Sequence, residues 1–201
     1  MANRSEASRL SILDATLRLL ADENMTMKSL SIEAIAKEAG VGKTTIYRWW
    51  PSKAAVVIDA FMENHLLHTP VRTDVSVRVA LASHLRSLIR QYAGVAGRLV
   101  SQILAESQYD PELRAMFRER FFDDRYATIV ALVQRGIDNG EFSASLDPRI
   151  LTEMLYAPVY HRLLIGHHPL DEELADELIA TALEPARGPN PRARSTRRRA
   201  A

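Results

Sequence analysis

The side chains best suited to chemistry lie in residues 43–50, KTTIYRWW, where hydroxyl, guanidinium and aromatic groups follow one another without a carboxylate. At about 100° per residue, Ile46 and Trp50 share one side of a helix, while Thr44 and Arg48 lie on the opposite side. Hydroxyl and guanidinium groups donate hydrogen bonds to phosphate oxygens and to base edges. The outward face of this segment therefore predicts binding to nucleic acid.

The charge around this segment favours the same partner. Between residues 37 and 53 four basic side chains stand against one carboxylate, Glu38, which gives a local charge of 4 − 1 = +3. An ordinary pair of antiparallel helices with a solvated face is the alternative interpretation. A phosphate-binding loop is excluded at Gly42-Lys43-Thr44, because the earlier glycine that such a loop needs would be residue 37, which is Lys37.

The elements that must position this face are two short helices joined by a tight turn, within residues 31–53. Ser31 is a good N-cap, and apolar residues recur at helical spacing from Ile32 to Ala39. Gly40 is suited to end this first helix, and Val41 can fill the corner before the second helix. The pattern is that of a helix-turn-helix.

At these residues the chain resembles the tetracycline-repressor (TetR) family of bacterial transcriptional regulators. The resemblance rests on Ser-Ile-x-x-Ile-Ala-x-x-Ala-Gly-Val, on Thr45-x-Tyr47, on the aromatic Trp50 and on Ser52-Lys53. It implies that Tyr47, Trp49 and Lys53 contact phosphates. It also implies that the base readers come from Lys43, Thr44, Thr45 and Arg48.

Composition agrees with a globular, non-secreted protein. The 201 residues are 47% hydrophobic and contain no cysteine, so disulfides and cysteine-based metal or nucleophile chemistry are excluded. No segment approaches the roughly 18 apolar residues of a membrane span, and the amino terminus lacks the apolar core of a secretory signal. A cytoplasmic location is expected.

The net charge of +1 hides a basic tail. Six arginines follow the last acidic residue, Glu184, and the remaining body carries 20 basic against 25 acidic residues, or −5. Three prolines and small polar residues predict that residues 185–201 are disordered. Binding to nucleic acid and improved solubility both remain open as roles for this tail.

Only helical periodicity appears along the chain, so the predicted fold is all-α with about nine helices. A three-helix helix-turn-helix domain with a connecting fourth helix is expected in residues 1–67, and a helical regulatory and dimerisation domain in residues 74–184. Asp110-Pro111 and Asp147-Pro148 both predict helix starts, and Gly94 and Gly97 predict a break between helices. The segments 110–120 and 155–178 extend the TetR resemblance over most of residues 10–183.

The last two helices are apolar over much of their circumference, which predicts a four-helix interface in a homodimer. The residues assigned to this interface are Leu151, Leu155, Val159, Leu163, Leu174, Leu178 and Leu183.

An effector pocket is predicted where Pro158 removes a helical hydrogen bond and bends its helix. The residues assigned to it are aromatic or apolar with a few polar groups: Tyr92, Phe117, Phe121, Met154, Tyr156, Tyr160 and His161. Plain core packing is the alternative for these aromatics. No metal site and no cofactor are expected, since His167 and His168 are adjacent in a loop.

The sequence thus predicts a regulator, most simply a repressor, that binds a palindromic DNA operator as a homodimer and is released by a small apolar or aromatic effector. A DNA-binding protein without ligand control is the alternative. An enzyme is not expected, because the chain shows no nucleophile–base pattern and no metal-ligand spacing.

Overall fold

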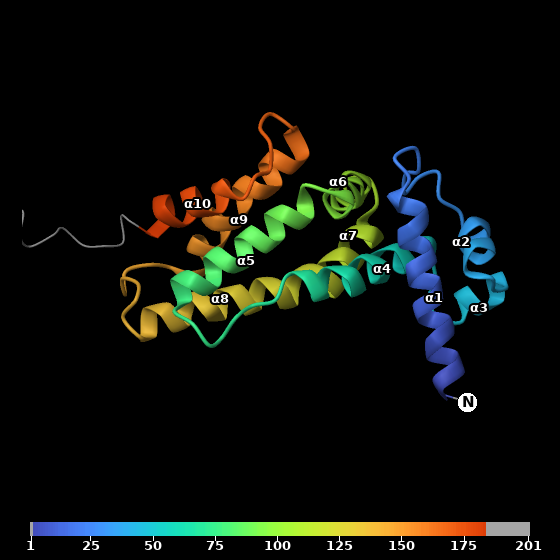
Figure 1. Cartoon of the computed structure of the whole chain (residues 1–201), viewed down its shortest axis with the longest axis horizontal. Coiled ribbons are helices and arrows are strands. Elements are labelled where there is room, and N and C mark those ends of the chain that lie inside the picture. Colours follow the sequence, from blue (N-terminus) through green and yellow to red (C-terminus); the bar gives the residue numbers. More distant parts are fainter. Residues whose placement is uncertain (1, 184–201) are drawn as a thin grey trace, which may run out of the picture. The chain divides into compact units, whose positions relative to one another are not determined.

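The computed structural model describes residues 2–183, including all their side chains except those of residues 2–4 and 64–68. The arginine-rich tail predicted from the sequence lies outside these residues. All regular structure in the described part of the chain is helical, as predicted (Figure 1). Because α7, η1 and α8 are continuous, residues 2–183 form nine uninterrupted helical stretches. Their elements are α1 (Ala2–Ala21), α2 (Ile32–Ala39), α3 (Lys43–Tyr47), α4 (Lys53–His68), α5 (Val77–Tyr92), α6 (Val95–Ser107), α7 (Pro111–Phe117), the π-helical η1 (Arg118–Phe122), α8 (Asp123–Asp138), α9 (Pro148–Ile165) and α10 (Glu173–Leu183).

The helices group into two compact units. Among the described residues, the first contains residues 2–70 and Arg90–Arg125, and the second contains Val71–Ile89 and residues 126–183. The first crossing between units falls between residues 67 and 74, where the sequence predicts a domain boundary. By contacts, however, α6, α7 and η1 belong with α1–α4 rather than with the carboxy-terminal helices.

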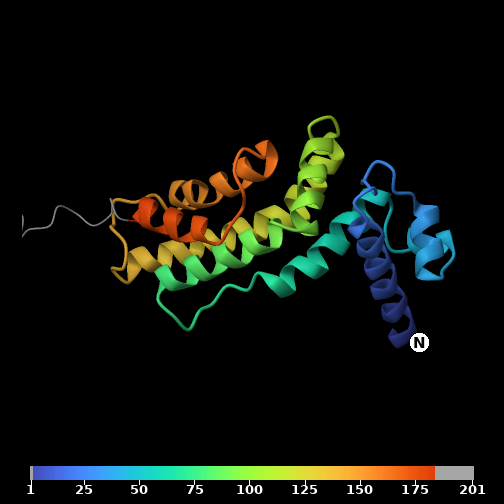
Figure 2. The same cartoon turned by 45° about the horizontal axis from the view of Figure 1, so that its top comes forward.

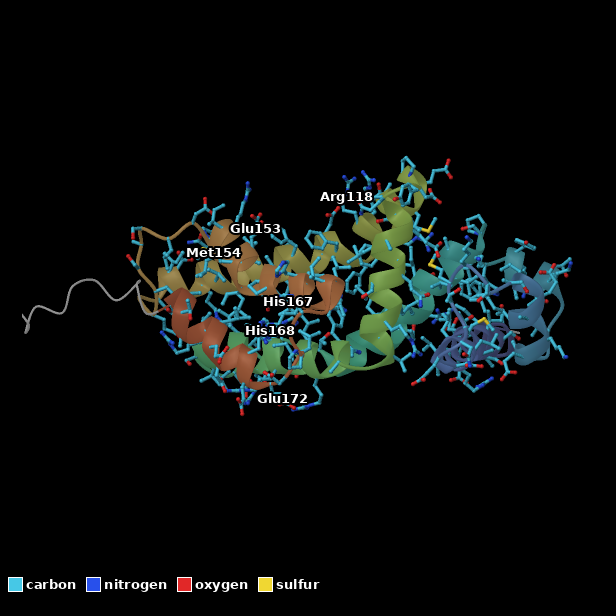
Figure 3. The ribbon with its side chains drawn as sticks, turned by 90° about the horizontal axis from the view of Figure 1, so that it is seen from above. Arg118, Glu153, Met154, His167, His168 and Glu172 are labelled. Carbon is cyan, nitrogen blue, oxygen red and sulfur yellow. The ribbon has the colours of Figure 1, made fainter. Side chains whose placement is uncertain are left out.

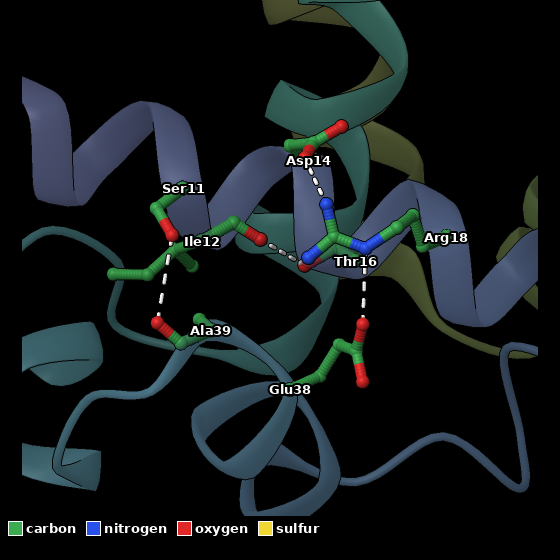
Figure 4. Close-up of polar contacts among 7 residues, drawn as sticks. All are labelled: Ser11, Ile12, Asp14, Thr16, Arg18, Glu38 and Ala39. Atoms are coloured by element: carbon green, nitrogen blue, oxygen red, sulfur yellow. Dashed lines mark hydrogen bonds and ion pairs between the residues drawn. The ribbon is translucent and has the colours of Figure 1, made fainter.

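In the first unit α1 packs on α2 and α4. Its buried face is formed by Ile12, Leu13, Thr16 and Leu20, whereas Leu10 is 42% exposed. Polar contacts fasten α1 to α2 at two places (Figure 4). Arg18 Nε donates to Glu38 Oε1 at 3.0 Å, and Ser11 Oγ donates to the Ala39 carbonyl at 3.5 Å.

The helix ends follow the local sequence signals. The Ser31 hydroxyl accepts a hydrogen bond from the Ala34 amide, and Gly40 adopts φ +66°, the left-handed conformation that glycine reaches without strain. The Asp110 and Asp147 carboxylates each accept hydrogen bonds from two amides of the following first turn. The predicted starts of α7 and α9 are therefore confirmed.

In the second unit α5, α8, α9 and α10 run alongside one another (Figures 1 and 2). Glu141 holds the start of α5 to the turn after α8, because its carboxylate accepts hydrogen bonds from the Val77 and Arg78 amides at 3.1 and 3.3 Å. Arg86 pairs with Asp176, which ties α5 to α10. None of the described helices combines the length and the apolar character needed to cross a membrane.

The prediction that Gly97 breaks a helix is wrong, because Gly97 lies within α6 and is buried. A Cβ atom at this position would lie 1.9 Å from the carbonyl oxygen of Tyr92. Gly97 is therefore required so that α6 can pass close to the end of α5. The chain turns at Gly94, the N-cap of α6, where an added Cβ would meet nothing closer than the Gln91 carbonyl at 3.7 Å.

We expect Gly97→Ala to lower the free energy of unfolding by about 1–3 kcal/mol, because backbone atoms must move to admit the methyl group. Gly94→Ala is the matched control and should cost less, about 1 kcal/mol or below, since only the N-cap preference changes. Urea denaturation followed by circular dichroism measures both. Equal midpoints for the two variants would contradict this account of Gly97.

Candidate nucleic-acid interface

The recognition segment, residues 43–50, begins with α3, which has only five residues, Lys43–Tyr47. Helical hydrogen bonding continues beyond it, since the Arg48 amide donates to the Thr44 carbonyl at 3.2 Å and the Trp50 amide to the Ile46 carbonyl at 3.0 Å. Ile46 is completely buried and Trp50 is 2% exposed. These two side chains fix the segment to the rest of the first unit.

The opposite face is open, as the helical wheel predicts. Tyr47 is 54% exposed and Trp49 38% exposed. Lys43, Thr44 and Arg48 are also exposed, while Thr45 is half-buried at the edge. The structure therefore brings six of the seven residues assigned to DNA onto one accessible surface segment, Lys43–Trp49.

Lys53, the seventh residue, lies outside this surface segment and contacts backbone carbonyls of the same unit. Its ammonium group donates to the carbonyl oxygens of Met27 at 2.6 Å, Leu30 at 2.9 Å and Lys28 at 3.4 Å. An ammonium has three donors, and all three point at these carbonyls. In this structure Lys53 ties the start of α4 to the loop between α1 and α2.

Glu33 is a neighbour of the recognition face that the sequence analysis missed. It lies on α2, and its Oε1 accepts a hydrogen bond from Lys43 Nζ at 2.9 Å. This contact lowers the pKa of the Glu33 carboxyl and raises the pKa of Lys43. Both side chains are more than half exposed, so the pair is weak and open to competition from a phosphate.

Two side chains of α6 hold the loop that Lys53 also contacts. Gln102 Oε1 accepts a hydrogen bond from the Met27 amide at 2.7 Å. One turn earlier, Arg98 donates to the carbonyls of Leu20 and Ala21 at 3.2 and 3.1 Å. These carbonyls end α1, where a cation is favourable to the helix dipole. The helix-turn-helix is therefore fastened to α6 as well as to α4.

The residues assigned to an effector pocket fall into two sets. Tyr92, Phe117 and Phe121 lie in the first unit, and all three are at most 6% exposed. The Phe121 ring packs against Phe117 at 5.0 Å and against Phe61 of α4 at 4.9 Å. Core packing, the alternative interpretation of these aromatics, describes Phe117 and Phe121.

The remaining four pocket residues, all on α9, belong to the second unit: Met154, Tyr156, Tyr160 and His161. Met154 is 56% exposed and His161 is also exposed, so neither lines an enclosed pocket in the single chain.

Tyr156 makes a polar contact that the sequence did not indicate. Its hydroxyl lies 2.7 Å from Nδ1 of His84 on α5, and His84 is 6% exposed. Burial raises the pKa of Tyr156 well above its ordinary value, so the phenol stays protonated. A hydrogen-bonded polar pair thus lies among helices whose inner faces are leucine and valine.

Most residues assigned to the dimer interface are buried within the chain itself. Leu151, Leu155, Val159, Leu174 and Leu183 are at most 3% exposed. They belong to the core of the second unit, which corrects their assignment, because the apolar pattern of a helix does not distinguish its own core from a partner. Leu163 and Leu178 are half-buried.

A different stripe of α9 remains open. Ile150, Met154, Leu164 and Ile165 are between 50% and 65% exposed, and Ala157 and His161 are exposed between them. Figure 3 labels Met154 on this helix, with His167 and His168 in the loop that follows it. The ring centroids of His161 and His167 lie 4.6 Å apart, and those of His167 and His168 lie 4.8 Å apart. Nevertheless, the described residues contain no group of three or more metal-ligating side chains placed to hold a metal ion.

Two family models match the chain. Residues 12–60 match the model for bacterial regulatory proteins of the tetR family, and residues 73–182 match the model for the tetracyclin repressor-like carboxy-terminal domain. Among curated relatives, the uncharacterized HTH-type transcriptional regulator YdeS of Bacillus subtilis is 29% identical over 181 residues, which cover 90% of each chain.

Solved structures share the whole fold. The TetR family transcription regulator SCO0332 is 30% identical, with a TM-score of 0.72, and the match covers 88% of this chain and 97% of that one. FadR from Bacillus subtilis in complex with stearoyl-CoA is 19% identical, with a TM-score of 0.71 over 87% of this chain and 97% of that one.

We expect Glu33→Gln to tighten binding to DNA of any sequence and to steepen its salt dependence, because it frees Lys43 for a phosphate. One added phosphate contact makes the slope of log affinity against log salt more negative by about 0.9. Fluorescence anisotropy with labelled DNA at several salt concentrations measures both.

Glu23→Gln makes the same change of charge in the loop between α1 and α2. It should raise affinity less than Glu33→Gln. If the two variants gain equally, the Glu33–Lys43 pair has no specific effect on DNA binding.

Proposed function

Because the chain belongs to the TetR family of bacterial transcriptional regulators, we propose that it is a ligand-responsive repressor. It binds a palindromic operator as a homodimer and is released by a small apolar or aromatic molecule. It acts by binding alone, without a catalytic step, and it works in the cytoplasm, where bacterial DNA lies.

The exposed recognition face is the observation that carries this proposal. A segment with Ile46 and Trp50 buried presents Thr44, Tyr47 and Arg48 outward, with Lys43 at its start. Such a helix enters the major groove, where guanidinium and hydroxyl groups distinguish base pairs. In a two-fold dimer two such helices reach successive major grooves about 34–36 Å apart, so the operator has matching half-sites.

The exposed stripe of α9 is the surface that we propose for dimerisation. Residues 150, 154, 157, 161 and 164 alternate steps of four and three, the spacing at which two helices pack side by side. Isolated apolar side chains are common on protein surfaces, whereas a stripe of this length favours a partner helix. Leu163 on α9 and Leu178 on α10 are half-buried and extend the proposed surface.

Met154→Glu should give a folded monomer, because the charge would be buried without a partner only in the dimer. Leu155→Glu should instead unfold the chain, since Leu155 is fully buried in the monomer. Sedimentation velocity with circular dichroism separates the two results. A folded Met154→Glu variant that stays dimeric and still selects a palindrome would contradict the proposed interface.

The effector site that we propose lies around His84 and Tyr156 in the second unit. Buried polar groups in an apolar interior provide the few oriented contacts that fix a small ligand, and the His84 ring and the Tyr156 hydroxyl are hydrogen-bonded to each other. The stearoyl-CoA complex of FadR, a protein with this fold, supports the proposal that the regulatory helices accommodate a small molecule. An effector changes the affinity of the protein for its operator because it binds two states of the protein with different affinities.

A metabolite screen should identify an apolar or aromatic compound that weakens operator binding about 5–150-fold, and operator DNA should weaken binding of the compound equally. Tyr156→Phe should reduce this response, since it removes the hydroxyl but not the ring. Tyr126→Phe is the matched control, because its hydroxyl donates to Glu153 on the surface. If no compound changes operator affinity, the protein binds DNA without ligand control.

A further inference from the structure

Asp59 on α4 uses both carboxylate oxygens to join two elements that are distant in sequence. Trp50 Nε1 donates to Oδ2 at 2.7 Å, and Arg120 donates to Oδ1 at 2.9 Å. The Asp59 side chain is 28% exposed and that of Arg120 is 40% exposed. One carboxylate therefore connects the end of the recognition segment to the π-helical η1.

Trp50 lies at the end of the recognition segment, directly before Pro51. Its ring is almost fully buried, and its amide continues the helical hydrogen bonding of α3. The indole has a single polar hydrogen, and Asp59 accepts it. The orientation of this ring, and hence of the helical turn that carries Arg48 and Trp49, depends on where the Asp59 carboxylate is held.

The element that holds Asp59 on its other side is unusual. Residues 118–122 of η1 are π-helical between α7 and α8, a geometry that is rare and frequently found at functional sites. Two consecutive residues of η1 reach α4: Arg120 pairs with Asp59, and the Phe121 ring packs on Phe61 at 4.9 Å. The π-helical turn thus gives α4 a polar and an apolar contact side by side.

We propose that Asp59 and Arg120 are positioning residues for DNA recognition, which act through the indole of Trp50. Arg120 orients the Asp59 carboxylate, and this carboxylate orients Trp50 and the last turn of the recognition segment. A change in η1 would therefore alter operator affinity although η1 contributes no residue to the recognition face. The inference rests on the proposed binding of an operator through residues 43–49.

The Arg120–Asp59 pair is suited to positioning more than to holding the fold together. Partly exposed ion pairs contribute little to stability, so loss of Arg120 leaves the chain folded. The same loss frees one oxygen of a carboxylate whose other oxygen orients Trp50. Operator binding and unfolding should therefore respond differently to Arg120→Ala.

Arg118 provides a matched control within η1. It is labelled in Figure 3, and its guanidinium pairs with Glu119 and Asp123, at 3.7 and 3.6 Å. Arg118→Ala and Arg120→Ala remove the same charge from the same π-helical segment. A general electrostatic effect on DNA binding would be equal in the two variants.

The first experiment measures affinity for a selected operator and for unrelated DNA in the full-length protein. Arg120→Ala should weaken operator binding by about tenfold, with unrelated DNA little affected, while Arg118→Ala leaves the ratio unchanged. Asp59→Asn should weaken operator binding similarly, because its amide no longer attracts Arg120. The double variant Asp59→Asn/Arg120→Ala should bind the operator no more weakly than Asp59→Asn alone, as expected for residues in one chain of contacts.

The second experiment reports on Trp50 directly and requires no DNA. The chain has two tryptophans, so Trp50 is the only one left in a Trp49→Phe background. In that background, Arg120→Ala should change the emission of Trp50, whereas Arg118→Ala should not. This measurement tests whether Arg120 positions Trp50 even if Asp59→Asn fails to fold.

Folded Arg120→Ala protein with wild-type operator selectivity and unchanged Trp50 emission would overturn the inference. If wild-type protein selected no operator at all, the proposed function would fail and the inference with it. Selective binding by the wild type together with an unaffected Arg120→Ala variant would contradict the inference alone.

Discussion

The recognition face depends on the burial of Ile46 and Trp50. A helix of five residues is far too short to be stable by itself, so α3 keeps its geometry only through contacts with the rest of the first unit. Ile46 is fully buried and Trp50 nearly so. The exposed side chains of the same segment, including Thr44, Tyr47 and Arg48, are presented to a partner because these two side chains are fixed.

The contacts around this anchor form one connected set within the first unit. Lys53 ties α4 to the loop between α1 and α2, and Gln102 and Arg98 tie α6 to the same loop and to the end of α1. Asp59 then connects Trp50 with η1. The grouping of residues 90–125 with the helix-turn-helix has a clear physical basis in these bonds. In the proposed mechanism, a displacement of α6 or η1 therefore acts directly on the helix-turn-helix, because these hydrogen bonds connect them.

Local signals in the sequence were sufficient for the elements and for the face of the recognition segment. Ser31, Gly40 and Asp110 end or begin helices through contacts with residues nearby in the chain, and the wheel that buries Ile46 and Trp50 needs only helical spacing. Contacts between distant residues were not predictable in this way. Arg120 and Asp59 are 61 residues apart, and nothing in the spacing of either indicates the other. The same holds for His84 and Tyr156, which are 72 residues apart.

The buried leucines of α9 and α10 show a further limit. The apolar periodicity predicts that Leu151 and Leu155 are removed from water. Burial in the core of one chain and burial in the interface between two chains produce the same periodicity. The exposed Ile150 and Met154 could be separated from them only when the neighbouring helices were in place.

The central claim, that the segment anchored by Trp50 reads base edges, is tested most directly by selecting DNA from a random library with wild-type protein and with Arg48→Ala. The wild type should enrich a palindrome. Arg48→Ala should enrich the same palindrome with preference relaxed at corresponding base pairs of both half-sites, a loss of about 1–3 kcal/mol of discrimination at each. An Arg48→Ala variant that selects the wild-type sequence with undiminished preference at every position, and a Thr44→Ala variant that does the same, would contradict the claim.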